Sequence, residues 1–289
     1  MPIRVTTEPS LRDLFTAEAV RDRGGRPVAG MFLSSGDATA AEICAGAGLD
    51  YLLIDAEHAP LSLESIQSQL RVIAGTGTLA LVRVPALDEV VIKQVLDLGA
   101  QNVLVPMVHT VQDAQAAVRA MHYPPRGVRG VGSALARSGR WNRTTGYLQD
   151  AGAQVTLLVQ VESATAVENA AEIAAVDGVD GVFIGPSDLS ATMGLIGQQA
   201  HPDVVAAVKT VIAEVKAAGK IVGVNAFVEA HARDYVEAGA DFVNVGADVA
   251  LLARGSEALA DTWCPDPGQE SGPGGAAAGP RASTPRGSY

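Results

Sequence analysis

Residues 51–60 read YLLIDAEHAP, and the change within them from apolar to ionisable side chains decides the fold. The first four, residues 51–54, predict a short buried strand, and Asp55, Glu57 and His58 follow at once. Three ionisable groups directly after an apolar run suit a site better than a core. Other ionisable residues also follow apolar runs: Arg83 after LALV, Glu162 after TLLVQV and Asp188 after GVFIGPS. Such residues at the C-terminal ends of successive strands are typical of (β/α)8 barrels.

Apolar runs and helical segments alternate along most of the chain. The runs predicted as strands are residues 27–32, 51–54, 79–84, 102–106, 154–161, 181–184, 221–225 and 242–245. The segments with helical period or composition include residues 39–47, 63–73, 90–98, 111–121, 164–175, 202–218 and 228–238. Runs that are apolar throughout are typical of parallel strands covered on both faces. Eight strand–helix units in about 250 residues predict an α/β protein with a (β/α)8 TIM barrel.

A doubly wound open sheet is the alternative architecture, but no G-x-G-x-x-G sequence follows the first predicted strand. We therefore predict one barrel domain over residues 1–263, with a lead-in helix at residues 11–20 that could close the barrel bottom. The long connection at residues 123–146 is predicted to be a functional loop or an oligomer contact. Residues 264–289, which are rich in Gly, Pro, Ala and Ser, are predicted to be a disordered tail.

Composition limits the classes of partner. The chain has 289 residues and a formal net charge of -11, and it has no basic run. This charge repels nucleic acid and anionic membranes, so neither is expected as a partner. The apolar stretches are broken well short of a membrane span, and the N-terminus has no signal-peptide pattern. We expect a cytoplasmic protein that acts on small molecules.

Glu162 and Asp188 are the candidate metal ligands. They follow the fifth and sixth predicted strands, so their carboxylates can converge above the barrel. Two oxygen ligands without Cys or His nearby favour Mg²⁺ or Mn²⁺ over zinc, with water and substrate oxygens at the remaining positions. The alternative is a pair of solvated acids, with Glu162 and Ser163 capping the following helix.

His58 is the candidate general base, because imidazole titrates near neutral pH and a carboxylate neighbour, Asp55 or Asp97, can fix its tautomer. The alternative is a loop histidine that caps the helix after Pro60. Arg83 ends the third predicted strand, where its planar guanidinium could bind a carboxylate or an enolate oxygen. Its alternative role is a structural ion pair.

Residues 185–189, GPSDL, predict a turn from the sixth strand into a short helix. We predict that Gly185 and Ser187 line the substrate there, since amides at such a helix start bind carboxylates. The alternative is that Ser187 only caps the helix. The lysines lie on predicted helices or at the opposite rim: Lys93, Lys209, Lys216 and Lys220. We therefore expect no Schiff-base lysine, and we expect a metal to stabilise any enolate. A nucleotide cofactor is not expected either.

Longer strings combine into a family resemblance. They are LLIDAEHAP, RVP, IKQVLDLGAQNVLVPMV, YPPRGVRGVGSALARSGRWNR, LLVQVES, GVDGVFIGPSDLSATMG and HPDV. In one register from Gly30 to Arg254, they resemble the metal-dependent (class II) pyruvate aldolases of the 4-hydroxy-2-oxoheptanedioate / 2-keto-3-deoxy-sugar-acid type. The resemblance implies a hexamer of TIM barrels with sites near the subunit contacts.

The resemblance also implies residue roles. Glu162 and Asp188 hold Mg²⁺, Mn²⁺ or Co²⁺, with Gln160 beside them. Arg83 contacts the keto or enolate oxygen, and His58, supported by Asp55, is the base. Two further positions are assigned by the same match: Asp97 reaches a neighbouring subunit's site, and Phe32 stands for an aromatic residue, commonly Trp, at the mouth.

The implied activity is that of a lyase, the reversible aldol cleavage of a 4-hydroxy-2-keto acid to pyruvate and an aldehyde through a metal-stabilised enolate. Asn225 departs from the family pattern, because an apolar residue often faces the aldehyde there, and we predict that it bonds a hydroxylated aldehyde. Two other functions are considered: a CoA-ester lyase of the citryl/malyl type, and a non-catalytic barrel that binds pyruvate or metal. Breakdown of aromatic compounds and of sugar acids both fit the resemblance.

Overall fold

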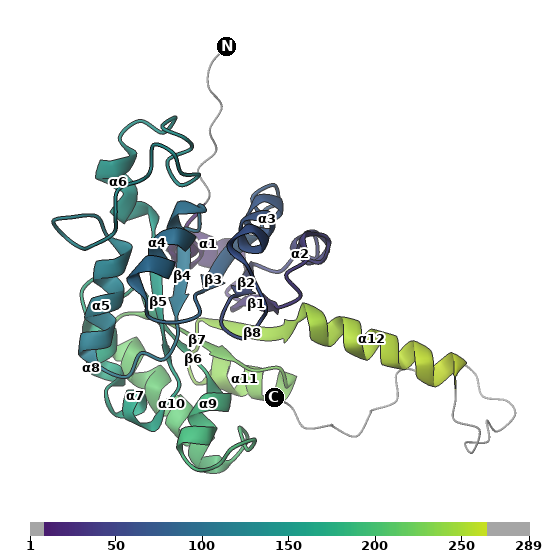
Figure 1. Ribbon diagram of the computed structural model, residues 1–289. Coiled ribbons are helices and arrows are strands. Elements are labelled where there is room, and N and C mark those ends of the chain that lie inside the picture. The colour runs from purple at the N-terminus through teal and green to yellow at the C-terminus, as the bar shows by residue number, and fades with distance from the viewer. Residues whose placement is uncertain (1–8, 265–289) are drawn as a thin grey trace, which may run out of the picture.

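The computed structural model describes residues 9–264 and has a closed barrel of eight parallel strands at its centre (Figure 1). Each strand pairs with the next in sequence, and the last pairs with the first. The strands are β1 (Val28–Leu33), β2 (Tyr51–Asp55), β3 (Leu79–Arg83), β4 (Asn102–Val105), β5 (Thr156–Val161), β6 (Gly181–Ile184), β7 (Ile221–Asn225) and β8 (Phe242–Ala247). The predicted TIM barrel is confirmed, and the doubly wound open sheet is excluded.

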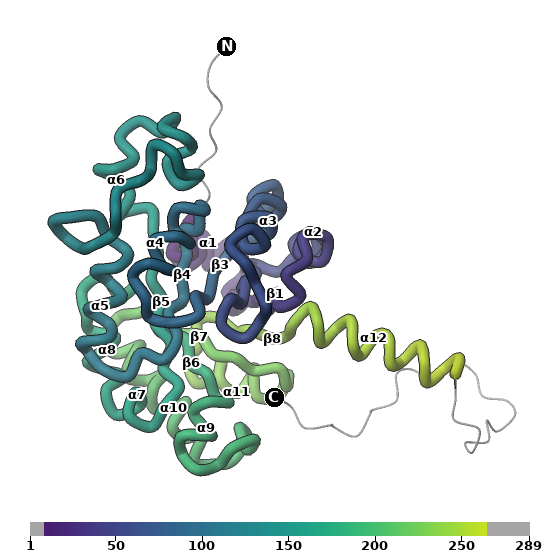
Figure 2. The backbone as a smooth tube through the Cα atoms, viewed as in Figure 1, coloured from purple at the N-terminus to yellow at the C-terminus, as the bar shows by residue number. Residues whose placement is uncertain are grey.

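Helices surround the barrel, as the tube in Figure 2 shows. They are the 3-10 helix η1 (Leu11–Phe15) and α1 (Ala17–Asp22), α2 (Ala38–Ala45), α3 (Leu63–Ile73), α4 (Glu89–Asp97), α5 (Val111–Met121), α6 (Tyr147–Gln154), α7 (Ala164–Glu168), α8 (Ala170–Ala175), α9 (Pro186–Thr192), α10 (Pro202–Ala217), α11 (Glu229–Glu237) and α12 (Asp248–Trp263). The connection at residues 123–146 contains turns and no regular element, as predicted. The apolar periodicity does not indicate α6, which follows this connection directly.

Two predicted helices are each interrupted by a capping or polar residue. The lead-in helix divides at Thr16, whose extended backbone (ψ 151°) ends η1 and whose hydroxyl accepts a hydrogen bond from the Ala19 amide of α1. The predicted helix at residues 164–175 divides at Asn169, which leaves helical geometry and donates its side-chain amide to the His109 carbonyl, 2.8 Å away. Both breaks follow from side chains that compete with the helix for backbone hydrogen bonds.

The barrel interior is filled by inward-facing apolar side chains, among them Val28, Phe32, Tyr51, Leu53, Leu81, Leu104, Leu158, Phe183 and Phe242. Two rings occupy room that glycines leave. A Cβ on Gly30 would lie 2.4 Å from the ring of Tyr51, and one on Gly223 would lie 2.1 Å from the ring of Phe242. Leu11 of η1 belongs to the same cluster, and its amide donates to Asn102 Oδ1, so the lead-in segment packs against the bottom of the barrel.

The last helix, α12, leaves the barrel instead of packing along it (Figure 1). Its large apolar side chains are exposed, including Leu252 at 71% and Trp263 at 79%. It is fixed at its first residue, Asp248, whose carboxylate accepts hydrogen bonds from the amides of Ser34 and Ser35. Across residues 9–264, no helix is long and apolar enough to cross a membrane. The predicted tail lies, apart from its first residue, outside the described residues.

Candidate active site

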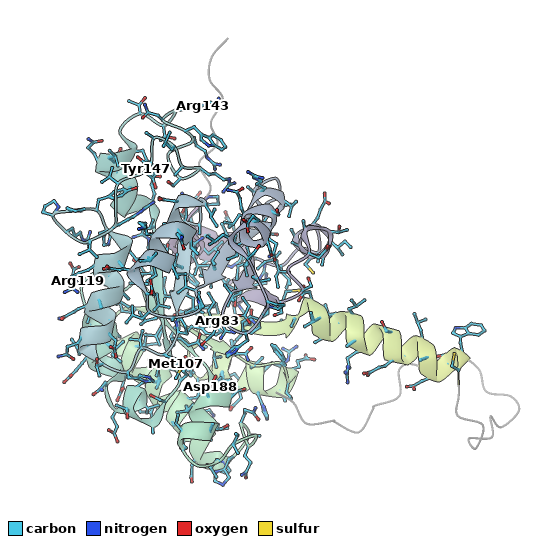
Figure 3. The ribbon with its side chains drawn as sticks, in the orientation of Figure 1. Arg83, Met107, Arg119, Arg143, Tyr147 and Asp188 are labelled. Atoms are coloured by element: carbon cyan, nitrogen blue, oxygen red, sulfur yellow. The ribbon has the colours of Figure 1, made fainter. Side chains whose placement is uncertain are left out.

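Arg83 organises the end of the barrel where β2 and β3 finish. It pairs in register with Asp55 and binds both oxygens of that carboxylate, with Nε 2.9 Å from Oδ1 and Nη2 2.9 Å from Oδ2. Its remaining nitrogen, Nη1, lies 3.0 Å from Glu57 Oε2. Figure 3 labels Arg83 with Met107 and Asp188 in this region. The arginine is therefore held by two acids and has a fixed direction.

Glu162 follows β5 and is 1% exposed. Its Oε1 accepts a hydrogen bond of 2.8 Å from the amide of Met107, and its Oε2 accepts one from the side-chain amide of Gln160. Met107 directs its amide toward the site from a left-handed backbone conformation, with φ 55°. Gly185 lies against the pair, since a Cβ there would be 2.8 Å from Glu162 Oε2 and 2.9 Å from Gln160 Nε2. The carboxylate is thus tightly positioned.

Asp188 lies in the first turn of α9 and completes an acidic cluster with Glu162 and Glu57. Burial, reinforced by the charges of Glu57 and Asp188, raises the pKa of Glu162 to about 7. Burial also raises the pKa of Glu57, with Arg83 opposing the shift. Glu57 and Asp188 thus both oppose ionisation of the buried Glu162, and a bound cation would relieve this repulsion.

The donor set of this cluster fits a divalent cation. Besides the carboxylates, one buried oxygen, Gln160 Oε1, accepts no hydrogen bond from the residues that the structure describes. Oxygen donors without sulfur or imidazole suit Mg²⁺ or Mn²⁺. Within residues 9–264 no three His, Cys, Asp or Glu side chains are grouped closely enough to hold an ion by themselves. A cation bound there would take its further ligands from water or substrate oxygens.

The capping alternatives for these residues do not apply. Ser163 alone caps α7, its hydroxyl accepting the Ala166 amide, and this leaves Glu162 out of the cap. Gly185, not Ser187, is the N-cap of α9, and the Ser187 hydroxyl instead accepts a bond from Gln199. The helix after Pro60 is capped by Ser62, so His58 has no capping role there.

His58 lies at the edge of the cluster with its ring largely exposed. Its Nε2 is 3.5 Å from Glu57 Oε2, whereas Asp55 Oδ1 accepts the backbone amide of His58 and not its ring. The carboxylate beside the imidazole is therefore Glu57, to which the sequence reasoning assigned no role. Its place in the same ionisable run, one residue from His58, is the signal that could have identified it.

Asp97 is not part of this cluster. It ends α4, which returns to the N-terminal ends of the strands, and its Oδ1 accepts a 2.8 Å bond from the buried guanidinium of Arg129. Within one chain, Asp97 and His58 lie at opposite ends of the barrel. Within its own chain, Asp97 therefore pairs with Arg129 and does not support His58.

Phe32 and Asn225 lie on the inner wall near the same end. The Arg83 guanidinium stacks over the Phe32 ring, 5.0 Å from its centroid, and Phe227 contacts that ring edge-on. Asn225 ends β7, and its buried Oδ1 has no hydrogen-bond partner among the described residues. The structure thus gathers all the predicted site residues at one end of the barrel except Asp97.

Similarity to known proteins identifies the family. The model of the family described as HpcH/HpaI aldolase/citrate lyase matches residues 28–255. The chain belongs to this family. A 4-hydroxy-2-oxo-heptane-1,7-dioate aldolase of Salmonella dublin is 51% identical to this HpcH/HpaI protein over 238 residues, which are 82% of this chain and 90% of the relative. The resemblance read from the sequence is confirmed at the level of the family.

Solved structures agree with the fold of this family. An HpcH/HpaI aldolase/citrate lyase family protein from Burkholderia cenocepacia J2315 has a TM-score of 0.79 and 43% identity, covering 82% of this chain and 95% of that one. A citrate lyase beta subunit of M. tuberculosis, complexed with oxaloacetate and magnesium, has a TM-score of 0.51 and 18% identity, covering 76% and 91% of the two chains. The second likeness shows the barrel fold alone.

Proposed function

We propose that this HpcH/HpaI protein is a class II pyruvate aldolase, a carbon–carbon lyase that cleaves a 4-hydroxy-2-keto acid reversibly to pyruvate and an aldehyde. The observation that carries the proposal is the acidic cluster of the buried Glu162 and the partly exposed Asp188 and Glu57, beside an arginine held by two acids. The activity of the Salmonella dublin relative, a 4-hydroxy-2-oxo-heptane-1,7-dioate aldolase by name, supports the same reaction class.

Glu162 and Asp188 would hold the divalent ion, Mg²⁺, Mn²⁺ or Co²⁺, with Gln160 Oε1 beside them. A cation bound there polarises a keto oxygen and lowers the energy of an enolate. The raised pKa of Glu162 supports this assignment, because a cation would stabilise three carboxylates that otherwise repel one another. Gly185 contributes by leaving the space in which the Glu162 carboxylate and the Gln160 amide meet.

Arg83 and His58 are assigned the remaining steps, which are stabilisation of the enolate charge and removal of the hydroxyl proton. Arg83 contacts the keto oxygen and stabilises the negative charge that develops there, since Asp55 fixes its direction. His58 takes the proton of the C4 hydroxyl through a ring nitrogen. The C3–C4 bond breaks, its electron pair remains with the three-carbon fragment as the enolate, and the aldehyde leaves. Protonation at C3 gives pyruvate.

The positions of the lysines support a route without a Schiff base. Lys93 lies on α4, and Lys209 and Lys216 lie on α10, where they form ion pairs with Asp234 and Asp241. Lys220 precedes β7, at the opposite end of the barrel from Arg83, and donates to the Val179 carbonyl. Amines in these positions cannot reach a carbonyl carbon at the C-terminal ends of the strands.

The protein is further proposed to act as a homo-oligomer, a hexamer by the family resemblance. The exposed apolar residues of α12 support this, because a monomer in water gains nothing from exposing Leu251, Leu252, Leu259 and Trp263. Sedimentation of Leu252→Glu, compared with Glu257→Gln on the same helix, tests the assignment. A smaller assembly for Leu252→Glu alone is expected, and an unchanged assembly contradicts it.

The aldolase function is tested with Glu162→Gln, Asp188→Asn and, as a control, Glu172→Gln on the exposed face of α8. Pyruvate is combined with a panel of aldehydes in the presence of Mg²⁺, Mn²⁺ or Co²⁺, and Mn²⁺ binding is measured separately by electron paramagnetic resonance. The first two variants are expected to fold, to lose Mn²⁺ binding and to lose turnover. Full turnover in excess chelator would refute the metal assignment. Turnover of malyl-CoA in place of a hydroxy-keto acid would favour the CoA-ester lyase.

A further inference from the structure

Two asparagines on neighbouring strands carry complementary unpaired atoms inside the barrel. Asn225 of β7 pairs in register with Asn244 of β8. Both face inward, because each lies two residues beyond an inward-facing partner, Gly223 or Phe242. Asn225 Oδ1, an acceptor, and Asn244 Nδ2, a donor, are buried and have no partner among residues 9–264. Buried polar atoms of this kind normally have a partner, so the pair indicates a binding position.

Tyr51 fixes the direction of Asn244. Its hydroxyl donates a 3.2 Å hydrogen bond to Asn244 Oδ1. To reach β8 from β2, its ring crosses β1 at Gly30, where any Cβ would lie 2.4 Å from the ring. Because the two ends of a carboxamide point in different directions, a hydroxyl on Oδ1 turns Nδ2 away from Tyr51. The donor is thus oriented by a buried contact and does not rotate freely.

Asn225 lies on the same line of strand pairing as Glu162 of the acidic cluster. Val161 pairs with Ile184, and Ile184 pairs with Val224. The next residues, Glu162, Gly185 and Asn225, therefore follow one another along the direction of pairing across three adjacent strands. Neighbouring strands are about 4.8 Å apart, so roughly 10 Å separates the backbones of Glu162 and Asn225. Only a glycine stands between them, and a keto acid anchored at Glu162 extends over it toward Asn225.

We propose that Asn225 and Asn244 together bind a hydroxyl group on the aldehyde half of the substrate, next to the carbon that becomes the aldehyde. The proposal rests on the aldolase function and names the class of aldehyde. A hydroxyl accepts a bond from Nδ2 and donates one to Oδ1 at the same time. A carboxylate only accepts, and a methyl group does neither. A water molecule can also accept and donate in this way. The choice of aldehydes distinguishes a substrate hydroxyl from water at this position.

The test compares two aldehydes of one shape, 2-hydroxypropanal and 2-methylpropanal, each condensed with pyruvate by the ion-loaded enzyme. Wild type is expected to prefer 2-hydroxypropanal in kcat/KM by about tenfold, the usual effect of a buried hydrogen bond. Asn225→Leu and the conservative Tyr51→Phe should each remove most of this preference. Tyr235→Phe, which removes the hydroxyl of another buried tyrosine, on α11 outside the barrel, should retain it.

The remaining outcomes overturn the proposal in distinguishable ways. Equal use of the two aldehydes by wild type means that water fills the position or that the two amides bond each other. A preference that survives Tyr51→Phe but not Asn225→Leu removes Asn244 from the site. If neither aldehyde condenses with pyruvate, while circular dichroism shows folded protein and Mn²⁺ binds, the aldolase function itself fails and not merely its specificity.

Discussion

Arg83 and Asp55 form a bidentate ion pair inside the barrel, with both contacts at 2.9 Å and both side chains nearly buried, at 6% and 5% exposure. The two residues pair in register on adjacent strands, so the barrel itself sets the geometry of the pair. One guanidinium nitrogen remains for Glu57, and the face of the guanidinium lies on Phe32. The orientation of the guanidinium is thus fixed before a substrate arrives, and one N–H each of Nη1 and Nη2 remains for a substrate oxygen.

Arg83→Lys is expected to reduce kcat/KM for aldol cleavage by about 100-fold, because an ammonium cannot bind Asp55 and an oxyanion in the same planar arrangement. The free energy of unfolding should fall by roughly 1–3 kcal/mol, since buried acceptors on Asp55 and Glu57 lose a donor. Steady-state kinetics and urea denaturation measure the two effects. A lysine variant with wild-type kinetics would show that charge alone suffices and that orientation is unimportant.

Gly185→Ala is expected to weaken binding of the cation, because its Cβ would lie 2.8 Å from Glu162 Oε2. The carboxylate must move by several tenths of an ångström, which a coordination site tolerates poorly. Gly246→Ala in β8 is the matched control, since nothing lies within 4 Å of a Cβ built there. Calorimetric titration with Mn²⁺ should give a dissociation constant about ten times larger for Gly185→Ala alone. Equal constants for the two variants would mean that Gly185 does not position the ligand.

The stability of the metal-free protein should decrease as pH rises. The pKa of Glu162 is about 7, above its ordinary value of 4.5, so in this interval the folded state binds more protons than the unfolded state. Its contribution to stability is complete below pH 4.5 and is lost as pH rises to 7, by up to ~3 kcal/mol. Urea denaturation in excess chelator measures the trend. Glu162→Gln should flatten it, and an unchanged slope in that variant would assign the effect to other groups.

Mixing two inactive variants should restore activity if Asp97 serves a neighbouring chain. His58→Ala lacks the base, and Asp97→Asn lacks the acid at the other end of the barrel. In a mixed oligomer, some sites combine the intact His58 of one chain with the intact Asp97 of another. Up to about a quarter of wild-type activity is expected after the two are dissociated and reassembled together, as random pairing dictates. No recovery in assemblies shown to be mixed would place the role of Asp97 within its own chain.

The barrel could be predicted because its strands are apolar throughout and end in ionisable residues. The same signal predicted the positions of Arg83 and Glu162, because the C-terminal ends of all the parallel strands lie at one end of the barrel. Asp188 was predicted in the same way, and it lies in the first turn of the helix that follows β6. Capping was harder to resolve, because Ser163 and Glu162 are both competent caps and only coordinates show that Ser163 acts alone. The sequence thus predicted which side chains lie in the candidate site better than it predicted the contacts among them.

The contacts that were missed depend on backbone geometry or on pairing across strands. The backbone amide of Met107 donates a hydrogen bond to Glu162 from a left-handed conformation. The side chain of Met107 gives no indication of this contact in the sequence. Glu57 adjoins His58, yet only the fold shows that Asp55 is engaged by Arg83 and leaves the imidazole to Glu57. Asn244 had a signal, an amide within the apolar run FVNV, that acquires meaning through its register with Asn225.

The most direct test of the central claim is the exchange of the C3 protons of pyruvate with deuterium in D2O, followed by nuclear magnetic resonance without any aldehyde. If Glu162 and Asp188 hold the ion on which enolate formation depends, wild type with Mg²⁺ or Mn²⁺ exchanges these protons rapidly. Exchange should fall to the uncatalysed rate in excess chelator and in Glu162→Gln. Exchange that continues undiminished in chelator, or in folded Glu162→Gln, would contradict the account.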